Sequence, residues 1–497
     1  MQMSSATELF EQCKAAIDAL NQPQETNGAN QWLMQFEGTT DAWGVADILS
    51  RDITNPSYRF FGARILYNKI QTDIKQLDVA SSNSLMESLV NHIIRLSQAP
   101  VLEMNVCRYM CLALSALAVQ LNMNGIVTQI LTWLNPILST QPIILLELLL
   151  VLPEECYNER IHVSHEYRDM FSQQLCQSAQ EVFGFLYSLI QMKPGVVVEI
   201  QILKCVEKWI YNIDMPVGFL ISQPVFIHTL ECLNRKDMID EAIEVIITVV
   251  RTYGYTSCYE DNIALFPILL QYILPLSATM WTPEITHVDG SESGLAFNNS
   301  YSNYGSSIHI QDDDDDNDVS CEHEDSMVIF RGLSRVLSEL AEAYMVFMLE
   351  IVGGLYGSEQ LDLKTNVNCL VSQLFTVVRF KYNFNISRIP LKFCYEMSEY
   401  LVKYRKRCSY EDDNKLYDDQ YYNGTGGNGN GNRNRNPELG CKHIATVEPW
   451  VEYVYTELLQ STIPQMLKSS SFLQGTTHCS DSFTCRLDEW MDLVSDC

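Results

Sequence analysis

The sequence has few basic residues for its length. Its 497 residues include 33 lysines and arginines against 62 aspartates and glutamates, so the formal net charge at pH 7 is −29. A protein whose main function is to bind nucleic acid needs clustered lysines and arginines that neutralise the phosphates. The charge balance therefore argues against direct nucleic-acid binding and favours a surface that attracts basic partners.

Long apolar runs are missing as well. The longest, Ile143–Leu152, carries Glu147 in its middle, whereas crossing a bilayer takes about 20 apolar residues. The N-terminal segment has no basic stretch followed by an apolar one, so we predict no secretory signal and no membrane span. Sixteen cysteines are scattered without a repeated spacing, which in a chain without a signal indicates reduced thiols.

Motifs of common enzymes and metal sites are also absent. The sequence has no phosphate-binding G-x-x-x-x-G-K-[ST], no G-x-S-x-G and no H-E-x-x-H. Cys321 and His323 lie close together, but no second pair of ligands is near them. We therefore predict no catalysis, no cofactor and no metal site.

Helical periodicity is what the sequence has in abundance. Phe61, Ile65 and Ile70 recur at steps of four or five residues and form one stripe of a helix. Asn55 and Pro56 ahead of them supply a cap and a first turn. Strand signals are few in comparison.

Short breaks divide the helical pattern into pairs. They fall at 134–136, 192–195 and 215–218, and a helix pair takes about 40 residues, the repeat length of HEAT proteins. One compact all-α domain of this length would be unusual. The predicted fold is all-α, a HEAT-repeat α-solenoid in which antiparallel helix pairs stack into a superhelix.

Two polar stretches interrupt this pattern. Residues 285–326 include five consecutive aspartates, and residues 409–440 are rich in asparagine and glycine. Neither has enough apolar surface to offset the entropy of ordering the chain, so we predict two disordered inserted loops.

The region 29–70 resembles the N-terminal region of the importin-β family. The matching positions are Trp32, Leu33, Ala42, Trp43, Phe60, Phe61, Ala63, Leu66, Asn68 and Ile70. Residues 69–77, 145–155 and 204–213 are similar to the transportin-SR and importin-thirteen branch of the karyopherin-β superfamily, with "VLPEE" at 151–155 the most specific match. Karyopherins of this type are about twice as long, so we expect the chain to correspond to the N-terminal half. A Lys common in the family is Tyr67 here.

The resemblance implies a nuclear transport receptor that shuttles between cytoplasm and nucleus. Such receptors bind the GTP form of the small GTPase Ran through their first repeats, carry protein cargo and contact nucleoporins. The cargo implied is basic or Arg-Ser-rich, and the direction of transport stays open. The alternative is a non-enzymatic α-solenoid scaffold, or a truncated relative that no longer transports cargo by itself.

The predicted organisation has six parts. They are an importin-β N-terminal-like region (1–78), HEAT-like repeats (79–284), the acidic insertion (285–326), further repeats (327–408), the Asn/Gly-rich loop (409–440) and a helical remnant (441–497).

The helix Ser57–Leu77 would be the inner helix of the second repeat. By resemblance, its residues Arg64, Asn68 and Lys69 are candidates to contact Ran. The alternative is that they are solvated residues on an exposed stripe. Five further residues are expected in the core of the first repeats: Trp32, Phe36, Trp43, Phe61 and Ile70.

The aspartate run is a second candidate site. Asp312, Asp313, Asp314, Asp315 and Asp316, with Asp318, form an acidic loop that would reach basic surface on Ran or on cargo. The alternative is a solvated charge run without a partner.

Overall fold

The structure is a computed structural model in which helices account for every regular element of the described residues. These residues are 5–20, 22, 25–255, 258–281, 320–354, 361–379, 389–397, 399–400, 449–454 and 456–457. The chain divides into two units, residues 1–229 and residues 230–497. Each unit is described separately.

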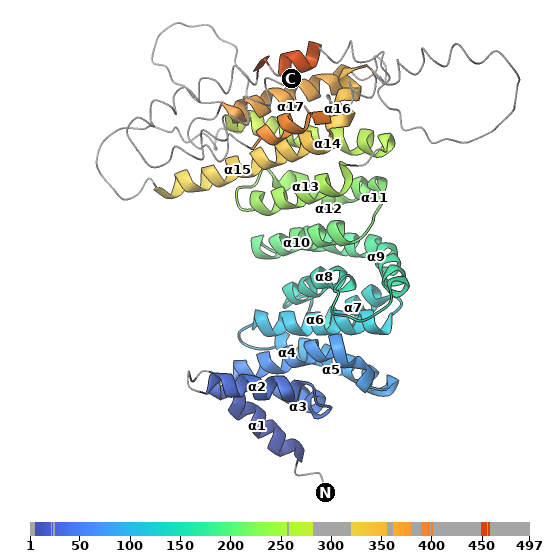
Figure 1. Ribbon diagram of the computed structural model, residues 1–497, viewed down its shortest axis with the longest axis vertical. Coiled ribbons are helices and arrows are strands. Elements are labelled where there is room, and N and C mark those ends of the chain that lie inside the picture. The colour runs from blue at the N-terminus through green and yellow to red at the C-terminus, as the bar shows by residue number, and fades with distance from the viewer. Residues whose placement is uncertain are drawn as a thin grey trace, which may run out of the picture. The chain divides into compact units, whose positions relative to one another are not determined.

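Unit 1 is a stack of helix pairs in chain order (Figure 1). In each pair one helix packs on the next: α1 on α2, α3 on α4, α5 on α6, α7 on α8 and α9 on α10. The helices are α1 (Ser5–Ala19), α2 (Thr26–Glu37), α3 (Asp41–Leu49), α4 (Pro56–Asp73), α5 (Val79–Ser97), α6 (Met104–Leu121), α7 (Ile126–Leu134), α8 (Pro142–Cys156), α9 (His165–Gln191), α10 (Val196–Asn212) and α11 (Val217–Ser222). Two 3-10 turns, η1 (Ile74–Gln76) and η2 (Asn135–Ile137), follow α4 and α7, and α12 (Pro224–Cys232) contains the unit boundary.

The second helices of successive pairs form a row in which α4 packs on α6, α6 on α8 and α8 on α10. α4 and α6 run side by side in the same direction. Arg59 pairs with Glu103 at their amino ends, and Gln120 Nε2 donates to the carbonyl oxygen of Ile70, 3.2 Å away, near their carboxyl ends. Small buried residues of α6, such as Ala113 and Ala116, allow both neighbours to approach closely.

The closest helix crossing of the second pair lies at Gly62. A Cβ at this position would lie 2.6 Å from Ser50 Oγ and 2.7 Å from the carbonyl oxygen of Ala46. Only glycine lets α4 approach α3 so closely. This contact fixes how α4 lies on α3.

Unit 2 is helical in its described residues. Its helices are α13 (Ile239–Tyr253), α14 (Tyr259–Trp281), α15 (Ser320–Ala343), α16 (Met345–Val352) and α17 (Leu361–Val378). α13 packs on α15 and is joined to it by the ion pairs Arg335–Glu244 and Arg251–Glu339. α15 begins at Ser320, within the insertion predicted to run to residue 326.

The described residues confirm the predicted all-α fold of the HEAT-repeat type. Among the described residues, two helices are long and apolar enough to cross a membrane by length and composition, namely α6 and the segment Tyr259–Ala278 of α14. α6 is packed between α4 and α8, and α14 packs on α17. The predicted loop 409–440 lies outside the described residues.

Candidate functional site

α4 has one buried face and one face toward the surface. The Asn55 side chain accepts a hydrogen bond from Ser57 N at 2.9 Å, and Pro56 occupies the first turn. Ile65 and Ile70 are buried. The opposite face, called the α4 face below, consists of the half-buried residues Phe60, Phe61, Arg64, Tyr67 and Asn68.

Arg64 lies at the centre of the α4 face. Its guanidinium carbon is 4.8 Å from the centroid of the Phe61 ring, an arrangement favourable for a cation–π contact. Its Nε is buried and has no hydrogen-bond partner among the described residues. Within the same residues no carboxylate forms an ion pair with Arg64, whereas Arg59 and Lys69 on the same helix each have one. Arg64 is therefore a cation without a counter-charge in the part of the chain that the structure describes.

Lys69 is buried, with only 1% of the residue exposed. Its Nζ lies 3.0 Å from the carbonyl oxygen of Glu37, 2.9 Å from that of Thr39 and 2.9 Å from Asp73 Oδ2. A cation at the carboxyl end of α2 satisfies carbonyls that have no partner within the helix. The Trp43 ring lies 5.0 Å from the ammonium group. The prediction that Lys69 faces a partner differs from the structure, in which its ammonium group is buried and bonded to residues of the same chain.

Asn68 also reaches α2. Its Nδ2 donates to Glu37 Oε1 at 2.6 Å. Both Asn68 and Lys69 therefore join the second helix pair to the first. Of the three predicted contact residues, Arg64 is the one whose polar group is left without an internal partner in the described residues.

Aromatic rings line the α4 face on the side of α6. Tyr109 packs edge-on against Phe60, with ring centroids 5.2 Å apart, and against Tyr67 at 6.0 Å. Phe60 and Phe61 are in edge contact at 5.8 Å. Arg64 thus lies among half-buried rings, a setting enriched in protein–protein contact sites.

Tyr67 connects the α4 face to the end of α8. Its hydroxyl donates to Glu155 Oε1 at 2.7 Å, and Asn158 Nδ2 donates to Glu155 Oε2 at 3.0 Å. Burial raises the pKa of Glu155 above the usual carboxyl range, although these two hydrogen bonds oppose the shift. Burial also raises the pKa of Tyr67. The residue that departs from the family pattern therefore contacts the "VLPEE" segment.

A second polar link crosses the row at Glu147 of α8. Arg108 Nη1 of α6 donates to Glu147 Oε1 at 2.6 Å, and Gln201 Nε2 of α10 donates to Glu147 Oε2 at 2.9 Å. Glu147 is buried, whereas Arg108 is exposed. The row therefore presents a second arginine, although this one is paired.

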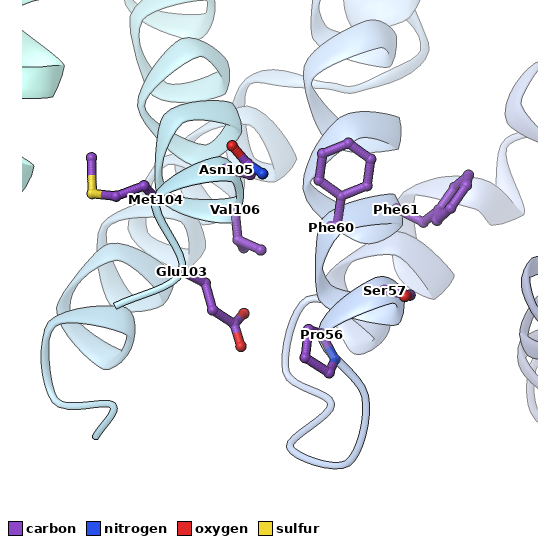
Figure 2. Close-up of a pocket in the computed structure, with 8 residues that line it drawn as sticks. All are labelled: Pro56, Ser57, Phe60, Phe61, Glu103, Met104, Asn105 and Val106. Atoms are coloured by element: carbon purple, nitrogen blue, oxygen red, sulfur yellow. The ribbon is translucent and has the colours of Figure 1, made fainter. Parts of the chain in front are cut away.

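A shallow hollow opens between the first turns of α4 and α6 (Figure 2). It has a volume of about 370 Å³. Its lining, called the amino-end hollow below, consists of Pro56, Ser57, Phe60, Phe61, Glu103, Met104, Asn105 and Val106. Figure 2 shows Val106 directed toward α4 and Phe61 on the side of α4 away from α6. Arg59 Nε donates to Glu103 Oε2 at 2.9 Å and neutralises this carboxylate.

The residues expected in the core of the first repeats differ in burial. Phe36, Trp43 and Ile70 are buried. Trp32 is half-buried and stacks on Phe36 with ring centroids 5.2 Å apart. Phe61 is half-buried on the α4 face. The predicted acidic site, Asp312–Asp316 with Asp318, lies outside the described residues.

Ser88, His92 and Asp47 meet between α3 and α5. His92 Nε2 lies 2.8 Å from Asp47 Oδ1 and 3.3 Å from Ser88 Oγ. A serine hydrolase relay needs the serine and the carboxylate on opposite nitrogens of the imidazole. Here both contact the same nitrogen, and Ser88 donates directly to Asp47 at 2.5 Å. The cluster joins two helices and is not arranged to activate Ser88.

Known proteins match part of the chain. A family model described as "Exportin 1-like protein" matches residues 103–246. Transportin MOS14 of Arabidopsis thaliana is 27% identical over 275 residues, which cover 53% of this chain and 28% of that protein. The mRNA transport regulator MTR10 of Saccharomyces cerevisiae is 29% identical over 295 residues, covering 54% of this chain and 28% of that protein.

Over about half of its length the chain is similar to karyopherin-β nuclear transport receptors. The predicted resemblance to their transportin and importin-13 branch is confirmed, since importin-13 of Bos taurus is 24% identical over 258 residues, covering 50% of this chain and 26% of that protein. The match to these relatives spans little more than a quarter of their length. A solved structure of importin-13 in its cytosolic state gives a TM-score of 0.48 at 16% identity, covering 72% of this chain and 36% of that one.

The sequence analysis predicted the helix of this candidate site but not all of the residues on its surface. Tyr109 and the amino-end hollow were not predicted, because both depend on α6 lying beside α4. The one signal in the sequence was the doublet Phe60–Phe61.

Proposed function

We propose that this chain acts as a nuclear transport receptor whose α4 face binds Ran·GTP and whose repeats carry protein cargo through the nuclear pore. The role is that of a binding protein, without catalysis. The proposal includes nucleoporin contacts and shuttling between cytoplasm and nucleus. Its support from known proteins is the relation to transportins and importin-13.

The observation that supports the proposal most is the state of Arg64. In a chain of net charge −29 an arginine would ordinarily find a carboxylate. Arg64 has none among the described residues, and its Nε is buried without an acceptor. An acidic group of a bound protein would supply the counter-charge and would accept hydrogen bonds from the terminal nitrogens of the guanidinium.

Stacked repeats suit a receptor that must release its cargo. Small rotations between neighbouring pairs add up, so two ligands that favour different curvatures oppose each other. Their coupling is a free energy of about 1–3 kcal/mol that each ligand exerts equally on the other. The acidic balance of the chain favours a basic or Arg-Ser-rich cargo, and the aspartates at 312–316 and 318 are the proposed acidic loop that would meet it.

The test is retention of Ran in two nucleotide states. Ran loaded with a non-hydrolysable GTP analogue and Ran loaded with GDP are each passed over the immobilised chain. The proposal expects the GTP form to be retained and the GDP form to pass through. Equal retention of both forms, or retention of neither, would contradict Ran-dependent transport.

The hydrogen bonds of Asn68 and Lys69 to α2 favour a second candidate function, an α-solenoid scaffold that does not depend on Ran. Two of the three residues that the family resemblance assigned to Ran are engaged with α2 instead. A scaffold would bind its protein partners with the same affinity whether or not Ran·GTP is added. Competition between a basic cargo peptide and Ran·GTP separates the two functions, because only the receptor releases the peptide.

A further inference from the structure

We propose that the protein bound at the α4 face is held at two points, by an acidic side chain at Arg64 and by a large apolar side chain in the amino-end hollow. This inference rests on the proposed function and names the chemistry of the partner segment. The two points are adjacent, since Phe61 lies under the Arg64 guanidinium and also lines the hollow. One segment of a partner therefore covers both.

The hollow offers an apolar contact. Phe60, Phe61, Met104 and Val106 are four of its eight lining residues. Two exposed apolar residues come shortly before the lining residues in the sequence, namely Ile53, 88% exposed, three residues before Pro56, and Val101, 73% exposed, two residues before Glu103. Exposed aliphatic residues beside an apolar hollow form the kind of patch that marks a protein contact.

The charges around the two points determine which group binds where. Glu103 is the one ionisable residue that lines the hollow, and Arg59 neutralises it. The rim therefore has no net charge to attract an ionised group. Arg64 is the opposite case, because it carries a charge that no described carboxylate balances. Charge complementarity thus assigns the acidic group to Arg64 and an uncharged apolar group to the hollow.

The spacing of the two points limits the partner sequence. Arg64 is four residues beyond Phe60, about 6 Å along the helix axis. Side chains two residues apart on an extended strand are separated by about 6.6 Å. Side chains four residues apart on a helix have a similar separation. The partner segment therefore carries an Asp or Glu and a large apolar residue at one of these two spacings.

Two variants of exposed lining residues test the hollow directly. Met104→Glu adds a carboxylate to the rim, and Asn105→Trp fills the space. Met170→Glu is the matched control, since Met170 on α9 is exposed and lies outside the hollow. The readout is the dissociation constant for Ran bound to the non-hydrolysable GTP analogue, with circular dichroism to verify folding.

The inference expects both hollow variants to weaken binding by about tenfold and the control to stay within about twofold. If the wild-type chain binds the GTP form and both hollow variants bind equally well, the apolar point is wrong while the proposed function stands. If the wild-type chain does not bind Ran·GTP at all, the proposed function fails and the inference fails with it.

Discussion

The ammonium group of Lys69 lies 3.0 Å from the carbonyl oxygen of Glu37, the last residue of α2. This contact spans two helix pairs and is reinforced by the carbonyl oxygen of Thr39 and the carboxylate of Asp73. A lysine is rarely buried without such partners. Lys69 therefore acts as a cap for α2 that is supplied by α4.

Replacing Lys69 by methionine should lower the free energy of unfolding of the first two helix pairs by about 2–4 kcal/mol, because the carbonyl oxygens of Glu37 and Thr39 lose this donor and Asp73 loses its ion pair. Lys75→Met is the matched control, since Lys75 is exposed and should change stability by less than about 0.5 kcal/mol. Hydrogen exchange of the α2 and α4 amides measures the effect locally. Equal exchange in the two variants would contradict the cap.

Gly62 and Gly44 should respond to alanine in opposite directions. At Gly62 a Cβ would clash with backbone atoms of α3, which cannot move aside. Gly62→Ala should therefore lower the free energy of unfolding by about 1–3 kcal/mol. At Gly44 nothing lies within 4 Å, so Gly44→Ala should gain about 0.5–1 kcal/mol from helix propensity. The thermal unfolding midpoints of both variants measure these changes. A higher midpoint for Gly62→Ala would show that α3 and α4 are not in close contact.

Tyr67→Phe should lower the free energy of unfolding by about 1–3 kcal/mol, because the buried carboxylate of Glu155 loses one of its two donors. Tyr157→Phe is a suitable control. Its hydroxyl forms a hydrogen bond with Ser172, but on an exposed side chain. Urea unfolding followed by tyrosine fluorescence compares the two. A loss as small as that of the control would mean that Tyr67 does not support Glu155.

The raised pKa of Glu155 makes a prediction about pH. The folded chain binds this proton more tightly than the unfolded chain, so the contribution of Glu155 to stability is fully present below the ordinary carboxyl pKa, about 4.3. It is lost as the pH rises through the raised pKa of the folded state. Glu155→Gln should therefore remove part of the decline in stability above that range, as measured by unfolding midpoints across pH. An unchanged pH profile would contradict the raised pKa.

The start and type of the helices could be predicted from local sequence because local interactions set them. Asn55 and Pro56 begin α4 as expected, and the break at 192–195 contains Lys193 and Gly195 with φ values of 53° and 89°. The spacing of apolar residues also indicated the buried stripe correctly at Ile65 and Ile70. These features depend on residues close together in the chain.

The role of Lys69 could not be predicted from neighbouring residues alone, because its carbonyl partners lie in and just after α2. The sequence nevertheless held a signal. Lys69 is four residues after Ile65 and three after Leu66, which places it on the buried stripe and not on the face of Arg64. A charged residue at a buried position indicates an internal partner, whereas Arg64 lies off the stripe. The hollow depends on the contact of α4 with α6 and had no local signal.

The account depends most on the claim that Arg64 meets an acidic group of Ran·GTP. The direct measurement is the equilibrium dissociation constant for Ran carrying a non-hydrolysable GTP analogue, determined for the wild-type chain, Arg64→Glu and Arg95→Glu. Arg95 is an exposed arginine of α5, so both variants change the net charge equally. We expect Arg64→Glu to weaken binding by about tenfold or more, about 1.4 kcal/mol, and Arg95→Glu to stay near the wild-type value. Equal affinities for the two variants would show that the α4 face does not bind Ran.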